Sequence, residues 1–363
     1  MEFLIRRGGI LVCLALLGPG RTLAQDKNYF FYHDLPYGSE ALYNPVTLVM
    51  NGTLDVLQNY SVQSRLSDIA WRVGATNVWR NITSPFPIIN QYGWNNFLKH
   101  EVFPTSLDYR NAQFVPNYLL HAVGGGMEFR KIWEWYDAHG YPVPQLFAGL
   151  TTYGFEFLNE TVENGNAYFP TTDPIADMLI FNPLGIILFS FDPVCSFFSS
   201  GLSLNDWSGQ MAISLSPFTV YNFGQTFVAK VPVVPAKGTS AFFLLGETAL
   251  LGVSQKFDSS NALSLGLGAT HLELFTVDVT NGIQTKSVKM GFVGGVYYDR
   301  DNSLLASLLV GNGLVEKVRL NVYPGLWEYG GFAPGLFAFL DKQGHPTVGI
   351  TVRWLPFGLT IQH

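Results

Sequence analysis

The sequence predicts an α+β fold, with helices over residues 25–205 followed by an antiparallel β-barrel of about eight to ten strands over residues 206–363. Three observations lead to this prediction. Apolar residues recur at helical spacing before residue 205, but they alternate with polar residues from Trp207 almost to the C-terminus. An export signal precedes both regions, and few residues are charged.

Residues 1–24 have the three parts of a cleavable signal peptide. A basic start precedes the apolar stretch Ile10–Leu17, and Thr22-Leu23-Ala24 fits the small-x-small cleavage rule. The apolar stretch is too short to span a bilayer as a helix. We therefore expect a mature chain that begins at Gln25 and resides in the bacterial outer membrane, with the periplasm as the alternative.

The composition of the chain restricts its partners. Only 13% of the 363 residues are charged, compared with about 25% in an average soluble domain. Such a chain has too little charge to cover its surface, so membrane lipid or another partner is expected to cover part of it. The net charge of −6 argues against nucleic acid. Signal cleavage leaves one cysteine, Cys195, which excludes an intramolecular disulfide.

The helical region is predicted from apolar spacing and from its proline and glycine residues. After an extended lead-in over residues 25–45, helices are expected at Pro45–Leu57, Ser64–Arg80, Asn90–His100, Gln113–Ala122, Met127–Ala138, Pro144–Val162 and Pro174–Ser190. Gly124-Gly125-Gly126 should break the helix around it, and Pro183 should kink the last one. None of these helices is predicted to span a membrane, because each carries charged or polar residues.

The region after Trp207 is predicted to form short alternating strands. The candidates are 209–216, 218–231, 240–253, 262–277, 285–299, 303–311, 315–323, 332–340 and 346–354. Segments of roughly ten residues with one apolar and one polar face are typical of a transmembrane barrel. A soluble antiparallel barrel or sandwich alternates in the same way, and the low charge favours the membrane. An eight-stranded barrel holds only side chains, so a helical plug would require more strands.

Six polar residues in the helical region form the strongest local pattern. Glu156, Glu160 and Glu163 lie at i, i+4 and i+7 and hence on one helical face. The apolar helix that follows carries Asp173, Asp177 and Asn182. These groups either bind a cation or a polar headgroup, or they hydrogen-bond to loop backbone and lock the hairpin to the barrel, as buried polar groups must find partners. The second interpretation is favoured.

This hairpin and two later motifs carry a resemblance to known proteins. Asp177 followed by Asn182-Pro183-Leu184-Gly185, with Leu204-Asn205-Asp206-Trp207 and Tyr221-Asn222-Phe223-Gly224-Gln225, resembles uncharacterised bacterial outer-membrane β-barrel families, over residues 100–355. The hairpin is also loosely similar to VanZ-like membrane proteins, in which the Asp and the Asn are four residues apart rather than five. The resemblance implies an envelope barrel and brings no activity with it.

Catalytic and metal-binding signals are weak in this sequence. His271 and Glu273 share one strand face, but Ser264 has the opposite parity and no nucleophile lies within reach of the His. The histidines are scattered, so neither a metal site nor a cofactor is predicted. We expect a non-enzymatic outer-membrane protein with a structural, anchoring or lipid- or small-solute-binding role. A lipid-modifying enzyme with a site at the barrel rim and a soluble periplasmic carrier of an apolar ligand are the alternatives.

Overall fold

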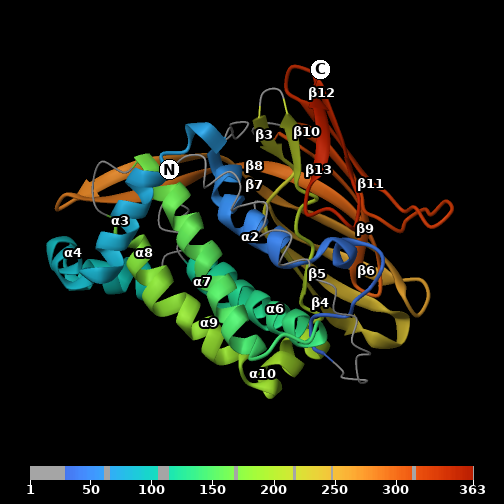
Figure 1. Ribbon diagram of the computed structural model, residues 1–363, viewed down its shortest axis with the longest axis horizontal. Helices are drawn as coiled ribbons and strands as arrows, with labels where there is room; N and C mark the ends of the chain where they lie inside the picture. The colour runs from blue at the N-terminus through green and yellow to red at the C-terminus, as the bar shows by residue number, and fades with distance from the viewer. Residues whose placement is uncertain are drawn as a thin grey trace.

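The computed structural model describes residues 29–60, 66–104, 114–166, 171–215, 218–246, 248–312 and 316–362, with the backbone alone at 58–60, 166, 271–280, 284–289 and 362. The predicted signal peptide lies outside these residues. An N-terminal helical region lies beside a large, strongly curved sheet (Figure 1). The predicted α+β class is therefore confirmed, with helices first and strands second.

Most helices follow the predicted order with shifted ends, but those at Pro85–Tyr92 and Asp192–Ser196 were not predicted, and the predicted start at Ser64 lies outside the described residues. They are α2 (Pro45–Leu54), α3 (Trp71–Thr83), α4 (Pro85–Tyr92), α5 (Trp94–Phe97), α6 (Gly126–Ala138), α7 (Pro144–Glu163), α8 (Asp173–Ala176), α9 (Asn182–Phe189) and α10 (Asp192–Ser196). Shorter 3-10 turns are η1 (Ser39–Leu42), η2 (Asp55–Tyr60), η3 (Leu66–Asp68), η7 (Asn164–Asn166) and η10 (Pro235–Lys237). Among the described residues, the π-helical segments are η4 (Leu98–Val102), η6 (Val115–Gly125), η8 (Asp177–Phe181) and η9 (Phe197–Gly201).

The predicted break at the three glycines is wrong, because η6 continues directly into α6. The glycines serve close packing instead. A Cβ on Gly124 would lie 2.5 Å from the ring of Phe227, and one on Gly126 would lie 2.5 Å from the ring of Phe189. Glycine is thus required here so that η6 and α6 can approach β4 and α9, an advantage that outweighs its low helix propensity.

The apolar helix expected at Pro174–Ser190 ends at Phe189, and a separate short helix begins at Asp192. The π-helical segment η8 lies just before Pro183, and α10 follows α9 at an angle of 88°. Within the described chain, no single helix has both the length and the apolar character that a membrane crossing requires. The bent pair Asp173–Phe189 and Asp192–Gly201 meets those criteria jointly, by length and composition only.

The C-terminal region forms one sheet of 13 strands. The strands are β1 (Asn205–Asp206), β2 (Ala212–Leu215), β3 (Phe218–Tyr221), β4 (Thr226–Val234), β5 (Thr239–Gly246), β6 (Thr248–Lys256), β7 (Asn261–Thr280), β8 (Ile283–Arg300), β9 (Ser303–Gly311), β10 (Glu316–Val322), β11 (Gly335–Asp341), β12 (Pro346–Thr351) and β13 (Gly358–Gln362). Their order is β1-β4-β5-β6-β7-β8-β9-β10-β11-β12-β13-β2-β3, with every pair antiparallel except β13 with β2.

The predicted closed barrel of about eight to ten strands is wrong in both closure and strand number. No described ladder joins the end strands β1 and β3, so the sheet is not closed into a barrel. The added strands arise because 240–253 is a hairpin, β5 and β6, and because 218–231 is divided into β3 and β4. The short strands β1 and β13 were not predicted, since two and five residues give too little alternation to detect.

Helix α2 bridges the two ends of the sheet. The segments between β1 and β2 and between β3 and β4 are not assigned to any strand. Backbone groups in these segments bond to side chains of α2 and of Asp55, which follows it. The side chain of Asn51 donates to the Gly209 carbonyl at 3.3 Å and accepts from the Gly224 N–H at 2.9 Å. Asp55 accepts from the Gln225 N–H at 2.6 Å. The same two segments also pair with each other, since Gly209 N–H donates to the Gly224 carbonyl at 2.9 Å, and Trp207 N–H donates at 2.7 Å to the carbonyl of Thr226, the first residue of β4. The side chains of Asn51 and Asp55 satisfy further backbone groups there.

The N-terminal segment fills the concave side of the sheet. In η1, Glu40 N–H donates to Ser303 Oγ at 3.1 Å and Ser39 Oγ donates to the Asp206 carbonyl at 3.2 Å. Leu42 packs in a buried cluster with Trp207 and with residues of β4–β9. Helices α6 and α9 cover the opposite face of β4, where Phe227 packs. The lead-in, not a helix, is therefore the element that the sheet encloses.

A buried charged cluster joins η1, α6 and β1. Lys131 is fully buried, and its ammonium lies 2.7 Å from Glu40 Oε1 and 3.5 Å from Asp206 Oδ2. Tyr43 O–H donates to Glu128 Oε2 at 3.2 Å. Burial raises the pKa of the Glu128 carboxyl well above its usual range, and the nearby Asp206 charge adds to this, against the opposing effect of Lys131.

Glu128→Gln is expected to flatten the pH dependence of stability. Because its folded-state pKa is raised, Glu128 keeps in the folded chain a proton that the unfolded chain releases above about pH 4.3. Stability should therefore fall as the pH rises from that value towards the folded pKa. Thermal unfolding at pH 5 and pH 8 should show a smaller decrease in Tm for the variant than for the parent chain. An equal decrease would contradict this assignment.

Candidate functional site

The structure brings the six predicted polar residues to one place inside the helical region. Helix α7 supplies Glu156, Glu160 and Glu163, as the predicted helical face required. Asp173 begins α8, Asp177 begins η8 and Asn182 begins α9. All except the half-buried Glu163 are buried. The turn η8 accommodates the five-residue spacing, which in a regular α-helix would separate Asp177 from Asn182.

His121, which sequence analysis did not single out, lies at the centre of this group. Its Nδ1 is 3.3 Å from Glu156 Oε2, and its Nε2 is 3.5 Å from Asp177 Oδ2. It lies on η6, a third element. No sequence motif pointed to it, because the residues around it carry no acidic partner at helical spacing. The two π-helical segments η6 and η8 were a second missed feature, and such segments are frequent at functional sites.

The two central groups have shifted pKa values. Burial lowers the pKa of His121, but the charges of Asp177 and Glu156 outweigh burial and raise that pKa well above its usual value. Burial raises the pKa of Asp177 to about 8, against the opposing charge of His121, and the neighbouring Asp173 and Glu163 add to the rise. The site therefore holds positive charge on the imidazole and resists full ionisation of its carboxyl groups.

Asp177 Oδ1 and Asn182 Oδ1 lie in this site without a hydrogen-bond donor among the described residues, and each of these residues is only 3% exposed. Next to Asn182 the backbone is that of Gly125, where a Cβ would lie 3.3 Å from Glu156 Oε1 and 3.9 Å from Asn182 Oδ1. The bare Cα of Gly125 keeps the backbone clear of both side chains.

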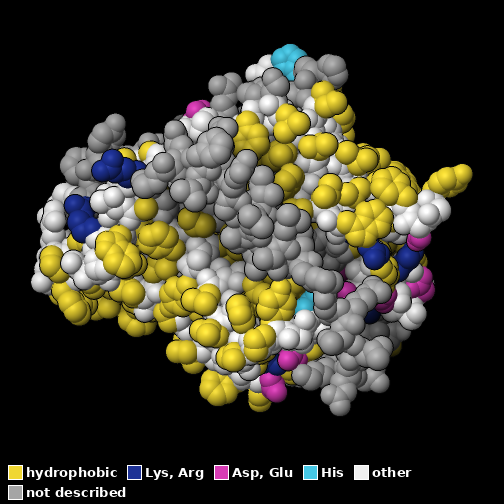
Figure 2. All heavy atoms as spheres, viewed as in Figure 1, with side chains coloured by type: hydrophobic (Ala, Val, Ile, Leu, Met, Phe, Trp, Pro, Cys, Tyr) yellow, Lys and Arg dark blue, Asp and Glu magenta, His cyan; other side chains and the backbone are white. Residues whose placement is uncertain are grey.

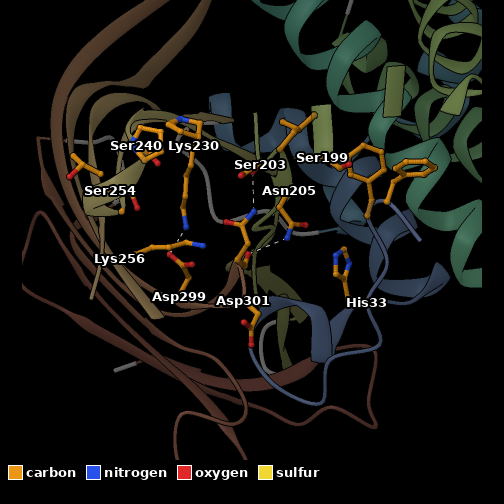
Figure 3. Close-up of a pocket in the computed structure, with 18 residues that line it drawn as sticks. His33, Ser199, Ser203, Asn205, Lys230, Ser240, Ser254, Lys256, Asp299 and Asp301 are labelled. Atoms are coloured by element: carbon orange, nitrogen blue, oxygen red, sulfur yellow. Dashed lines mark hydrogen bonds and ion pairs between the residues drawn. The ribbon is translucent and has the colours of Figure 1, made fainter. Parts of the chain in front are cut away.

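A second candidate site is a pocket of about 410 Å³ between the lead-in, η9 and strands β4–β8 (Figure 3). Lys230 Nζ and Asp299 Oδ1 are 2.5 Å apart, and Figure 3 shows the two side chains pointing toward each other. Lys256 is exposed beside them. Serines and asparagines line much of the remainder. The apolar side chains of Phe30, Phe31 and Leu204 line the pocket as well, so it offers both polar and apolar contacts to a small ligand.

The weak catalytic candidates do not gain support from the structure. His271 and Glu273 lie on β7, where the backbone is described but the side chains are outside the description. A bulge between them interrupts the pairing with β8, where His271 faces Met290 and Glu273 faces Lys289. The bulge breaks the regular two-residue alternation that placed both side chains on one face.

The outward face of the sheet is apolar. Its exposed residues alternate with buried ones along β5–β13 and include Phe243, Leu251, Val253, Leu263, Leu265, Leu267, Phe292, Val296, Leu308, Val310, Leu320, Leu336, Leu340, Val348, Ile350, Leu359 and Ile361. The enclosed face of the same strands carries buried polar side chains, among them Ser254, Ser264, Ser307, Asn321, Thr347, Thr351 and Thr360. Figure 2 shows hydrophobic side chains over much of one face of the molecule, with charges confined to a few places.

The comparisons with known proteins assign no family. The chain matches no protein-family model, and no curated protein or solved structure is significantly similar to it. The resemblance to outer-membrane families therefore stays a prediction from the motifs.

Proposed function

We propose that this protein is a non-enzymatic component of the bacterial outer membrane, in which the outward face of the sheet contacts lipid. The distribution of residues between the two sheet faces carries this proposal. A sheet in water places apolar residues inside and polar residues outside. Here the aliphatic side chains are exposed along consecutive strands, while hydroxyl and amide side chains are enclosed. Such a distribution fits a surrounding solvent of hydrocarbon.

The dimensions of the apolar band support the proposal. On β8 the described outward residues Met290, Phe292, Val296 and Tyr298 cover roughly nine residues, with the side chains of 284–289 outside the description, and a tilted strand needs 9–11 residues to cross a bilayer. The same band continues on β7 through Leu263, Leu265 and Leu267. A patch that crosses so many strands is far larger than scattered surface residues would produce.

Aromatic residues gather at one end of this band. Exposed or half-buried aromatic residues follow the C-terminal ends of β6, β8, β10 and β12, or lie close to them. They are Phe257, Tyr298, Trp327, Tyr329, Phe332, Trp354 and Phe357. Because neighbouring strands are antiparallel, those four ends lie on the same side of the sheet. Aromatic side chains are favoured at the boundary between lipid and water, which would be on this side.

Backbone N–H and C=O groups at the open ends of the sheet must be hydrogen-bonded if those ends lie in the hydrocarbon of a bilayer. Asn51 of α2 and Asp55 of η2 support this, since they bond to backbone groups of the segments that follow the end strands β1 and β3. The end strands are also short, with two residues in β1 and four in β3. We therefore propose that the helical region seals the edges that a closed barrel would not have.

Leu265→Arg is expected to cost about 2–4 kcal/mol when the protein is folded in lipid vesicles, because an arginine would enter the hydrocarbon. In water an exposed leucine tolerates this change within about 0.5 kcal/mol. The measurement is urea unfolding of the full chain in vesicles, together with recovery of the tagged chain from the outer-membrane fraction of cells.

Ser259→Arg is the matched control, since Ser259 is exposed in the turn after β6 and outside the apolar band. Its stability and its recovery from membranes should be unchanged. If both variants behave alike and the chain is recovered as a soluble periplasmic protein, the membrane proposal is wrong. The apolar sheet face would then have to be covered by another protein.

A further inference from the structure

We propose that His121, Glu160 and Asp177 bind a first-row divalent transition-metal ion inside the helical region. The ligand atoms of these three residues all lie within 4.8 Å of one another. Ligands at about 2.0–2.2 Å from one ion lie within roughly 4.4 Å of each other. Small side-chain rotations would therefore bring all three onto a common ion.

The three ligands come from three separate elements, each held by packing. His121 lies on η6, Glu160 on α7 and Asp177 on η8. Tyr118 on η6 packs against Phe181 of η8, with ring centroids 4.8 Å apart. Helix α6, which continues η6, packs closely against α9 through glycines. A Cβ added to Gly185 of α9 would lie only 3.1 Å from the backbone nitrogen of Gly126. Ligands on such rigid elements are pre-oriented before an ion binds.

Glu156 is not one of the proposed ligands, but it contacts the ring of the ligand His121. Its Oε2 lies 3.3 Å from His121 Nδ1, which leaves Nε2 directed at Asp177. A metal-binding histidine usually donates its other ring N–H to a carboxylate, which fixes the tautomer and makes the imidazole a stronger ligand. Glu156 and His121 have the relation that this role requires.

The electrostatics of the interior also favour a cation. Five carboxyl groups, those of the three α7 glutamates and of Asp173 and Asp177, share this interior with one imidazole. Glu160, Glu163 and Asp173 form a second group whose ligand atoms lie within 4.8 Å, so Glu160 belongs to both groups. Burying like charges together is costly, and a bound divalent ion offsets that cost.

An independent observation indicates that something is missing from the site. Asn182 Oδ1 has no donor among the described residues, although its side chain is buried. Asp177 Oδ1, on one of the three ligands, is also buried and lacks a donor within the described chain, and the ion or a water bound to it would supply the missing partner. One imidazole with carboxylates suits Mn²⁺, Fe²⁺ or Zn²⁺ better than Cu⁺, which prefers sulfur ligands.

The test is metal binding by the purified full chain, carrying no histidine tag. The chain is stripped with chelator, incubated with MnCl₂ or ZnCl₂ and desalted, and the retained metal is measured by mass spectrometry. We expect one retained ion per chain and an increase in Tm that chelator reverses. Glu156→Gln should weaken binding about 10–100-fold, as loss of such an outer carboxylate typically does.

Asp177→Asn and Glu160→Gln separate the metal from a purely structural role. Both changes keep the shape of the side chain, so folding is checked by the chelator-stripped Tm. If the site holds metal, both variants should lose the retained ion and the metal-dependent Tm increase. Glu128→Gln, which alters a buried carboxyl outside the site, should keep both.

Failure to retain either ion in the parent chain would overturn the proposal, as would undiminished retention in Asp177→Asn. The cluster would then be a protonated structural network that locks α7 to the apolar hairpin. This result does not depend on where the protein resides, because metal retention is measured on purified chain.

Discussion

Replacing Lys131 by alanine is expected to destabilise the folded chain by about 3–5 kcal/mol. Lys131 is fully buried, with its ammonium 2.7 Å from Glu40 Oε1 and 4.2 Å from the centre of the Tyr43 ring. Its removal leaves Glu40 and Asp206 buried without their counter-charge. Because these residues join η1, α6 and β1, the helical region should separate from the concave side of the sheet. Urea unfolding monitored by tryptophan fluorescence would measure the loss.

Two further variants test the reason for this effect. Lys237→Ala removes an exposed lysine and should change stability by less than about 0.5 kcal/mol. Glu40→Gln combined with Lys131→Met removes both charges and should recover part of the loss, as paired replacement of buried ions often does. If the double variant is as unstable as Lys131→Ala, lost packing rather than the unpaired charge is the cause.

Glu134→Ala is expected to release the N-terminal lead-in from α6, at a cost of about 3–5 kcal/mol. The Glu134 carboxylate accepts hydrogen bonds from the backbone N–H groups of Phe30, Phe31 and Tyr32 at 2.8–3.0 Å. It also pairs with Arg130 Nε at 2.9 Å. Alanine leaves these donors without an acceptor, and each unsatisfied buried donor costs about 1–3 kcal/mol.

The released lead-in should become sensitive to protease. Brief chymotrypsin treatment followed by mass spectrometry should show cleavage near Phe30 and Phe31 in the variant and not in the parent chain. Glu134→Gln keeps one carbonyl oxygen and should give an intermediate result. Equal protection of all three proteins would show that other contacts hold the lead-in. Because Phe30, Phe31 and His33 line the pocket beside Lys230, release should also open that pocket.

These results connect the two parts of the molecule. The lead-in and α2 are short segments, yet they contact the concave side and the two ends of the sheet. The sheet is therefore completed by the helical region and is not an independent unit. A chain without its helices would expose both sheet ends, and we expect it to aggregate through them.

The sequence by itself determined the class of fold and the order of its parts. Residue spacing located α7 at Pro144 and β9 at Ser303–Gly311, because periods of 3.6 and 2 are local properties of the chain. It also selected Glu156, Glu160, Asp177 and Asn182, which the structure brings together. Local spacing places residues that share a helix on one face, so this part of the site was predictable.

Only the tertiary structure decided the closure of the sheet and the centre of the site. Closure depends on which backbone groups pair at the ends of the sheet, and Asn51 of α2 takes bonds there that strand alternation cannot reveal. His121 joins Glu156 and Asp177 across sequence separations that carry no periodic signal. The run Gly124–Gly126 permits close packing instead of ending a helix, because its neighbours Phe227 and Phe189 come from distant segments. Each of these features depends on contacts between residues far apart in the chain, and such contacts exist only once the chain has folded.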